Sequence, residues 1–202
     1  MVMRGFTLSE ILMTLGILGV VAAMTIPTFF TKNTTNEHSA RIKKAYASVS
    51  MAFEDAWQSR GIGGMSKISI NEMAKAIPRT LKVRNKSGFG YTMYKPNQQI
   101  FDPGSFNVGV YTMYDGTIFG VNRADNYCEA PNTAGFEAVI DSNGAKGPNI
   151  VGKDIFVFFS CGSNAALKAH YQADASKCSS TTYSKSSDCS ARLIQNGLDV
   201  DW

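Results

Sequence analysis

The stretch that decides the fold is RGFTLSEILMTLGILGVVAAMTIP, residues 4–27. From Phe6 to Ile26, 21 residues, it carries one charged side chain, Glu10. As a helix rising ~1.5 Å per residue, such a segment spans ~30 Å, the thickness of the hydrocarbon core of a bilayer. The cation before it, Arg4, favours retention of that end in the cytoplasm and export of the rest. The sequence therefore predicts a helix that enters a membrane.

Two conventional interpretations of this segment are a plain signal anchor and a secretory signal peptide, cut after the small residues Val21-Ala22-Ala23. Glu10 argues against both. A carboxylate inside an apolar segment costs roughly 2.5–3.5 kcal/mol on insertion scales. Because a disposable signal gains nothing from that cost, Glu10 indicates a partner that neutralises it.

The residues RGFTLSE, 4–10, resemble the processing motif of type IV pilins and type II secretion pseudopilins. The resemblance implies that a prepilin peptidase cuts after Gly5 and methylates the new N-terminus, Phe6. It implies that Glu10 pairs with the N-terminal amine of a neighbouring subunit during filament assembly, and that Pro27 kinks the helix. A buried carboxylate that meets a cation in this way sets the register between subunits, as a lone polar group does in a coiled coil.

The resemblance also implies partners and a location. The partners are other pilin or pseudopilin subunits, the prepilin peptidase/methyltransferase, an inner-membrane assembly platform, and membrane lipid before assembly. The location is the bacterial inner membrane, crossed once with the head outside the cytoplasm, and then a periplasmic or cell-surface filament. The formal net charge of +4 includes no long Lys/Arg run, so no nucleic-acid partner is predicted.

Beyond Pro27 the apolar residues recur at spacings of three and four, which is typical of an amphipathic helix. We expect one long helix from about Thr7 to Ser59, its first half in the membrane and its second half packed on a globular head. The glycines of RGIGG, residues 60–64, favour its end. The stripe comprises Ile42, Ala45, Tyr46, Val49, Ala52, Phe53, Ala56 and Trp57.

A second, short helix is predicted in SINEMAKAIP, residues 69–78. Ser69 is a candidate N-cap and Glu72 stands three positions later, as in a capping box. We expect Pro78 to end this helix, because proline cannot continue the backbone hydrogen-bond pattern.

After this helix, aromatic and β-branched residues predominate, which predicts strands. They are concentrated in YTMYK (91–95), FNVGVYTMYDGTIFGVNR (106–123) and DIFVFFSCG (154–162). Asp115-Gly116 predicts a hairpin, and Asn143-Gly144 a turn. The Ser/Thr-rich final stretch, 173–202, is expected to be an irregular loop. The predicted fold class is α+β: a long N-terminal helix packed on a C-terminal antiparallel sheet, with the pilin-like shape that the resemblance implies.

This organisation gives four parts. Residues 1–5 are the expected prepilin leader, and residues 6–27 the transmembrane or filament-core helix. Residues 28–60 are the expected extracytoplasmic amphipathic helix, and residues 61–202 a globular β-rich head.

All four cysteines lie in the C-terminal half, and none forms a CxxC pair, so a zinc site is poorly supported. A head outside the inner membrane meets an oxidising compartment, where four cysteines allow three pairings. The resemblance implies Cys178 with Cys189, like the cysteine-bounded loop of many pilins, which would leave Cys128 with Cys161. Free buried cysteines are the alternative.

A candidate calcium site lies in DSNGAKGPNIVGKD, residues 141–154, where Asp141, Asn143, Asn149 and Asp154 supply oxygens around glycines. The stretch resembles a D-x-N-G-x-K-G-P-N segment of some pseudopilin-like heads, and calcium stabilises the head in parts of that family. It does not match an EF-hand loop, and an Asn-Gly turn followed by a Gly-Pro loop needs no metal. No other cofactor is expected.

Enzymatic motifs such as GxSxG, a Walker loop or HExxH do not occur, and His38 and His170 have no metal or triad spacing, so we expect surface histidines and no enzyme. The leading hypothesis is a structural filament subunit. The NGAKGPN stretch favours a type II secretion pseudopilin, whereas the closing cysteine pair favours a type IV pilus pilin for adhesion, motility or DNA uptake.

Two other classes of protein stay open. One is a secreted soluble binding protein or enzyme whose conventional signal peptide is cut near Ala23. The other is a monomeric membrane-anchored, lectin-like head with a platform of tyrosines, although alternating strand aromatics more often pack within a sheet. The tyrosines in question are Tyr91, Tyr94, Tyr111 and Tyr114.

Overall fold

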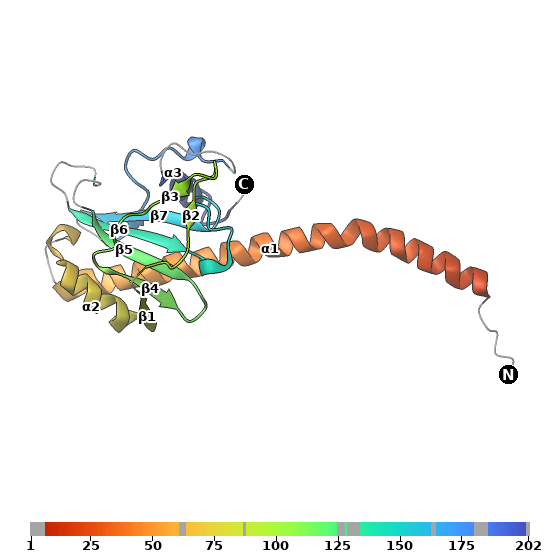
Figure 1. The fold of residues 1–202 in the computed structure, drawn as a ribbon, viewed down its shortest axis with the longest axis horizontal. Coiled ribbons are helices and arrows are strands. Elements are labelled where there is room, and N and C mark those ends of the chain that lie inside the picture. The colour runs from red at the N-terminus through yellow and green to blue at the C-terminus, as the bar shows by residue number, and fades with distance from the viewer. Residues whose placement is uncertain are drawn as a thin grey trace. The chain divides into compact units, whose positions relative to one another are not determined.

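The computed structural model describes residues 7–60, 64–86, 88–124, 128, 134–162, 165–179 and 186–200, with the backbone alone at 26–36, 60, 66, 85 and 86. Two compact units divide the chain, Met1–Glu37 and His38–Trp202. One helix, α1 (Leu8–Arg60), contributes to both units (Figure 1). Its bounds agree with the long helix that the sequence predicts.

In the first unit, the apolar part of α1 is long enough to cross a membrane. The window Leu8–Thr25 has a mean hydropathy of 1.9, and none of it is buried. Length and composition of this kind fit a membrane anchor and also a signal sequence near an N-terminus. Gly5 and Phe6 lie outside the described residues. Pro27 lies within α1, where only the backbone is described, so its predicted kink stays a prediction.

The second unit is built on an antiparallel sheet with the strand order β1-β4-β5-β6-β7-β8. Every neighbouring pair in that order is antiparallel. A separate two-stranded sheet pairs β2 (Met93–Tyr94) with β3 (Ile100–Phe101). The predicted α+β class, with an apolar N-terminal helix and a C-terminal antiparallel sheet, is confirmed. The six strands are β1 (Val83–Lys86), β4 (Gly109–Met113), β5 (Ile118–Ala124), β6 (Gly135–Asp141), β7 (Ile155–Cys161) and β8 (Leu167–Lys168).

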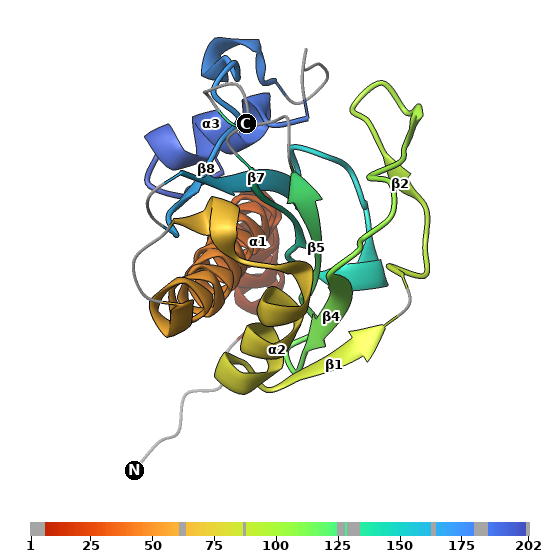
Figure 2. The same cartoon turned by 90° about the vertical axis from the view of Figure 1, so that its left-hand side faces the viewer.

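One face of this sheet packs on the C-terminal half of α1 and on α2 (Ile70–Thr80) (Figure 2). Phe53 of α1 meets Phe136 of β6, with ring centroids 6.3 Å apart. Tyr46 meets Phe158 edge-on, and its hydroxyl donates a 2.6 Å hydrogen bond to the Leu167 carbonyl. The predicted stripe is confirmed, since six of its members are buried and Tyr46 and Trp57 pack against them.

The local signals of the second helix and the hairpin are also confirmed, with one correction. Ser69 and Glu72 form a complete capping box at the start of α2. Pro78, however, lies inside α2, which ends at Thr80. Proline lacks only its own N–H donor, and the backbone after it can still bond: the Leu81 N–H donates to the Ile77 carbonyl at 2.9 Å, so the helix continues for two residues beyond Pro78. The turn at Asp115-Gly116 joins β4 to β5, with the Met113 N–H donating to the Thr117 carbonyl.

Several elements were not predicted from the sequence: β1, β3, β6, β8 and α3. Strand β6 lies between β5 and β7 and joins the predicted strand segments 106–123 and 154–162 into one sheet, whereas the predicted segment 91–95 contains β2 of the separate sheet. The stretch expected to be an irregular loop contains α3 (Asp188–Gln195), packed on the core through Leu193. Strand β8 pairs only with Phe159 and Ser160, at the end of β7. Farther along the same edge of β7, α3 supplies a hydrogen-bond acceptor: Ser190 Oγ accepts a 3.0 Å hydrogen bond from the Val157 N–H.

The opposite face of the sheet carries a second cluster of buried side chains, with β2 and β3 near it (Figure 2). Val139, Val157 and Ile155 form its centre, and Phe101 of β3 packs against it. Three short 3-10 turns connect the larger elements: η1 (Met65–Lys67), η2 (Gly144–Lys146) and η3 (Ala175–Lys177).

Candidate functional site

The start of the apolar helix is a capping box built from Thr7 and Glu10. The Glu10 carboxylate accepts hydrogen bonds from the Thr7 N–H and hydroxyl, both at 2.8 Å. The Glu10 N–H donates in return to Thr7 Oγ1 at 3.3 Å. A carboxylate in the first turn also interacts favourably with the helix dipole. Glu10 therefore has a local structural role, which the sequence interpretation did not include.

From Ile11 to Met24, α1 presents apolar side chains on all sides. Within Leu8–Thr25 no side chain is buried by another part of the described chain. Helices that are apolar all round are found in membranes or buried among other helices. The large exposed side chains are Leu8, Ile11, Leu12, Met13, Leu15, Ile17, Leu18, Val20, Val21 and Met24.

The candidate calcium loop between β6 and β7 is closed by its own carboxylates. Asp141 Oδ1 accepts hydrogen bonds from the N–H groups of Asn143 (3.0 Å) and Gly144 (2.7 Å). Its Oδ2 accepts one from the Tyr91 hydroxyl. Asp154 accepts from the N–H groups of Asn149 (2.8 Å) and Ile150 (2.7 Å). All four carboxylate oxygens thus have donors within the protein.

The amide side chains of this loop take part in the same closure. Asn143 Nδ2 donates to the Gly147 carbonyl, and Asn149 Oδ1 accepts from the Gly147 N–H. Asn143 Oδ1 is buried without a hydrogen-bond partner. In the part of the chain that the structure describes, no three or more His, Cys, Asp or Glu residues gather as a metal would need. The contacts support the turn-and-loop interpretation, and calcium binding stays a prediction.

Burial around this loop changes the acidity of its neighbours. Burial raises the pKa of Asp141 to about 7, although the Tyr91 hydrogen bond opposes the shift. Burial also raises the pKa of Tyr91, and the hydrogen bond to Asp141 adds to it. His38 Nε2 lies 3.1 Å from Ser142 Oγ, and burial lowers the pKa of His38. His38 is therefore not the surface histidine expected from the sequence.

The tyrosines do not form one platform. Tyr111 is 1% exposed and stacks on Phe119, with centroids 5.4 Å apart. Tyr91 is half-buried against Asp141, whereas Tyr94 and Tyr114 are exposed on different elements. Sheet packing, the alternative in the sequence analysis, describes Tyr111.

The four cysteines form two disulfides. Cys128, after β5, pairs with Cys161 at the end of β7, with Cα atoms 5.7 Å apart. Cys178, after η3, pairs with Cys189 of α3 at a Cα distance of 4.8 Å. This is the pairing that the resemblance implies, and it leaves no free cysteine. The first bridge joins the strand region, and the second holds α3 against the segment before it.

Comparison with family models, with curated proteins and with solved structures found no match to this chain. The resemblance to pilins and pseudopilins therefore rests on the residues of the N-terminal motif.

Proposed function

We propose that this chain is a structural subunit of a type IV filament system, similar to the pseudopilins of type II secretion. The observation that carries the proposal is the apolar surface of Leu8–Thr25, which no described part of the chain covers, with a single carboxylate in its first turn. In this proposal the chain waits in the inner membrane with its head outside, and is a substrate of the prepilin peptidase.

The energetics of that surface explain why it needs a cover. Burying one large apolar side chain is worth ~1.5–3 kcal/mol, so the ten exposed side chains of this segment represent on the order of 20 kcal/mol. Lipid covers the surface before assembly and neighbouring helices cover it afterwards. Because both environments are apolar, the helix can pass from one to the other without losing this energy.

In this proposal, Glu10 makes the filament more favourable than the membrane for the helix. In the membrane, the Thr7 N–H and hydroxyl solvate its carboxylate. Cleavage after Gly5 creates a cationic amine at Phe6. A neighbouring subunit's amine is a stronger partner for the carboxylate than the neutral Thr7 donors, because two opposite full charges attract each other strongly in apolar surroundings. Exchange of the local cap for the intermolecular ion pair then favours the assembled state.

Two alternatives have specific support. The Cys178–Cys189 bridge near the C-terminus favours a pilin of a type IV pilus. The position of the apolar helix near the N-terminus also fits a signal peptide cut near Ala23, which would release a soluble binding protein or enzyme.

Mass spectrometry of the mature N-terminus separates these classes. A chain that begins with N-methylated Phe6 supports a filament subunit, pilin or pseudopilin. A chain that begins at Met24 refutes the proposal and supports a secreted soluble protein. A mature chain that still begins at Met1 also refutes it, and indicates a plain anchor.

Glu10→Ala tests the role of the carboxylate. We expect the variant to be recovered in the membrane fraction at the parent level or above, because an insertion cost of roughly 2.5–3.5 kcal/mol is removed. Filament assembly in the native host should be lost. Thr14→Ala is the matched control, since it removes a polar group from the same helix and should assemble normally. Parent-level assembly of Glu10→Ala would show that the ion pair is not needed.

A further inference from the structure

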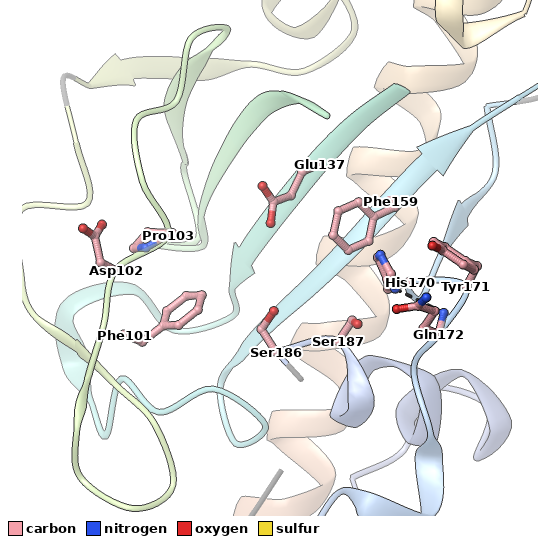
Figure 3. Close-up of a pocket in the computed structure, with 10 residues that line it drawn as sticks. All are labelled: Phe101, Asp102, Pro103, Glu137, Phe159, His170, Tyr171, Gln172, Ser186 and Ser187. Carbon is pink, nitrogen blue, oxygen red and sulfur yellow. Dashed lines mark hydrogen bonds between the residues drawn. The ribbon is translucent and has the colours of Figure 1, made fainter. Parts of the chain in front are cut away.

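A cavity of about 570 Å³ lies in the second unit, on the sheet face opposite α1 (Figure 3). Five separate segments line it: β3 with the residues after it, β6 at Glu137, β7 at Phe159, the segment after β8, and the residues before α3. Its volume is within the ~300–1,000 Å³ typical of small-molecule sites. Neither the filament proposal nor any sequence motif uses this cavity.

Glu137 of β6 is one of two carboxylates that line this cavity, the other being Asp102. Figure 3 shows the Glu137 carboxylate pointing away from β6 into the cavity, beside Phe159, with Phe101 across the cavity from them. No described residue donates a hydrogen bond to it, and burial alone raises its pKa to about 7. A carboxylate held in this way gains most from a ligand that brings a positive charge, because water no longer solvates it fully.

Among the residues that the structure describes, those lining the cavity include no lysine or arginine that faces Glu137. On its own face of the sheet the paired residues are Asn122 of β5 and Phe159 of β7, both uncharged. The other titratable residues that line the cavity are Asp102, His170 and Tyr171. Lys168 of β8 pairs with Phe159 and lies on the same face, but it is exposed and does not line the cavity.

Aromatic rings line the cavity. Phe159 packs edge-on against His170, with centroids 5.4 Å apart, and the ring centroids of His170 and Tyr171 are 4.5 Å apart. Phe101 lines the cavity from β3, across from Glu137 and Phe159 (Figure 3). Ring faces attract cations within about 6 Å of their centroids, and recognition of quaternary ammonium groups uses such rings. His170, expected at the surface from the sequence, is thus part of a wall.

Two serines before α3, Ser186 and Ser187, add polar groups to the cavity lining. Ser187 precedes α3 at its N-cap position but makes no side-chain capping hydrogen bond. The hydroxyls of Ser186 and Ser187 line the cavity, where they can hydrogen-bond to a ligand (Figure 3). A carboxylate and aromatic rings, with hydroxyls in the same lining, match a molecule that has an ammonium group at one end and a hydrogen-bonding group at the other.

We propose that this cavity is a binding site for a small organic cation that carries an ammonium group. Glu137 neutralises the ammonium group, Phe101 and Phe159 hold it between their rings, and Ser187 binds the polar end of the ligand. An anion is disfavoured by Glu137 and Asp102. A neutral ligand of the same shape loses both the ion pair and the cation–π attraction.

The probe is choline, and its neutral carbon isostere 3,3-dimethyl-1-butanol is the matched ligand control. Binding to the full chain in a non-ionic detergent is measured by isothermal titration calorimetry. We expect choline to bind at least roughly tenfold more tightly than the isostere, as a desolvated cation–π contact predicts. Because a proton competes for Glu137, the dissociation constant should rise about tenfold from pH 8 to pH 6.

Glu137→Gln keeps the side-chain shape and removes the charge, and should weaken choline binding roughly tenfold or more. Glu54→Gln, which changes an α1 carboxylate outside the cavity lining, should leave it unchanged. Independently of any variant, the carboxyl carbon of Glu137, followed by NMR, should titrate at lower pH when choline is present. Absence of choline binding, equal binding of the isostere, an unchanged Glu137 titration, or parent-like affinity of Glu137→Gln would each overturn the proposal.

Discussion

Asp141→Asn should remove an unusual pH dependence from the stability of the second unit. Asp141 is fully buried, accepts two backbone N–H groups, and has a pKa raised to about 7 from an ordinary 3.8, chiefly by burial. Asparagine keeps the oxygen that accepts those N–H groups. Its amide N–H₂ faces the Tyr91 oxygen, which can accept a hydrogen bond. The variant therefore preserves the contacts and removes only the titration.

The sign follows from proton linkage. A carboxyl whose folded-state pKa is raised binds its proton more tightly in the folded protein than in the unfolded chain. Its stabilisation is fully present below the unfolded pKa of 3.8 and is lost as the pH rises through about 7. Between pH 7 and pH 5 the parent should gain about 2 kcal/mol relative to the variant. For a unit of this size that difference corresponds to about 5 °C in melting temperature.

Other groups titrate in the same window, so only the difference between the two proteins is informative. Burial lowers the pKa of His38, and its stabilisation is lost as the pH falls below its unfolded value of 6.5, which opposes Asp141. Glu137 acts in the same direction as Asp141. Both groups are present in parent and variant, so their contributions cancel where the sites are independent.

The assay is denaturant unfolding of the full chain in a non-ionic detergent, followed by near-ultraviolet circular dichroism at pH 5, 6, 7 and 8. Glu54→Gln is the control, because Glu54 is an α1 carboxylate outside the loop and the cavity, and glutamine keeps the oxygen that accepts the hydrogen bond from Gln58. Parallel stability profiles for the parent and Asp141→Asn would refute the reasoning, since they would mean that the buried carboxyl titrates in the ordinary range.

Two further predictions concern the packing and the disulfides. Phe53→Ala, which empties a fully buried site against Phe136, should destabilise the second unit by about 3–5 kcal/mol, whereas Met51→Ala on the exposed side of α1 should cost less than about 0.5 kcal/mol. Denaturant midpoints of the two variants measure this, and equal costs would contradict the packing. Replacing both cysteines of Cys128–Cys161 by alanine should cost about 3.7 kcal/mol, and of Cys178–Cys189 about 2.8 kcal/mol, because the bridges close loops with sequence separations of 33 and 11. The same assay checks the order of the two losses, and a reversed order would show that strain or local packing outweighs loop closure.

The sequence predicts those elements whose stabilising contacts are close in the chain. Apolar side chains recur at every turn along the α1 stripe. The buried face of this helix can therefore be predicted from the sequence without knowing the sheet on which it packs. The capping box of Ser69 and Glu72 and the turn at Asp115-Gly116 are each complete within a few residues. The capping box of Thr7 and Glu10 has the same local signal. It was not predicted, because the charge of Glu10 within an apolar segment also indicates an intermolecular partner.

Elements that are stabilised by contacts with distant parts of the chain could not be predicted from the sequence. Strand β6 is buried on both faces along most of its length and is interrupted by Glu137, so it shows neither alternation nor a continuous apolar run. Helix α3 has eight residues, too short to be stable alone, and is held by the Cys178–Cys189 bridge and by Leu193 in the core. The residues that line the cavity come from five segments between Phe101 and Ser187, which share no motif.

The two faces of the sheet have different chemistry, and this keeps the two proposals independent. The face that packs on α1 is apolar, with Phe136, Phe158 and the helix stripe in one cluster. Glu137 and Asp141 alternate onto the opposite face of β6, since side chains two and four residues apart in a strand share a face. A ligand in the cavity therefore binds without displacing α1. Loss of choline binding would leave the filament proposal intact, and an unmethylated N-terminus would leave the cation site intact.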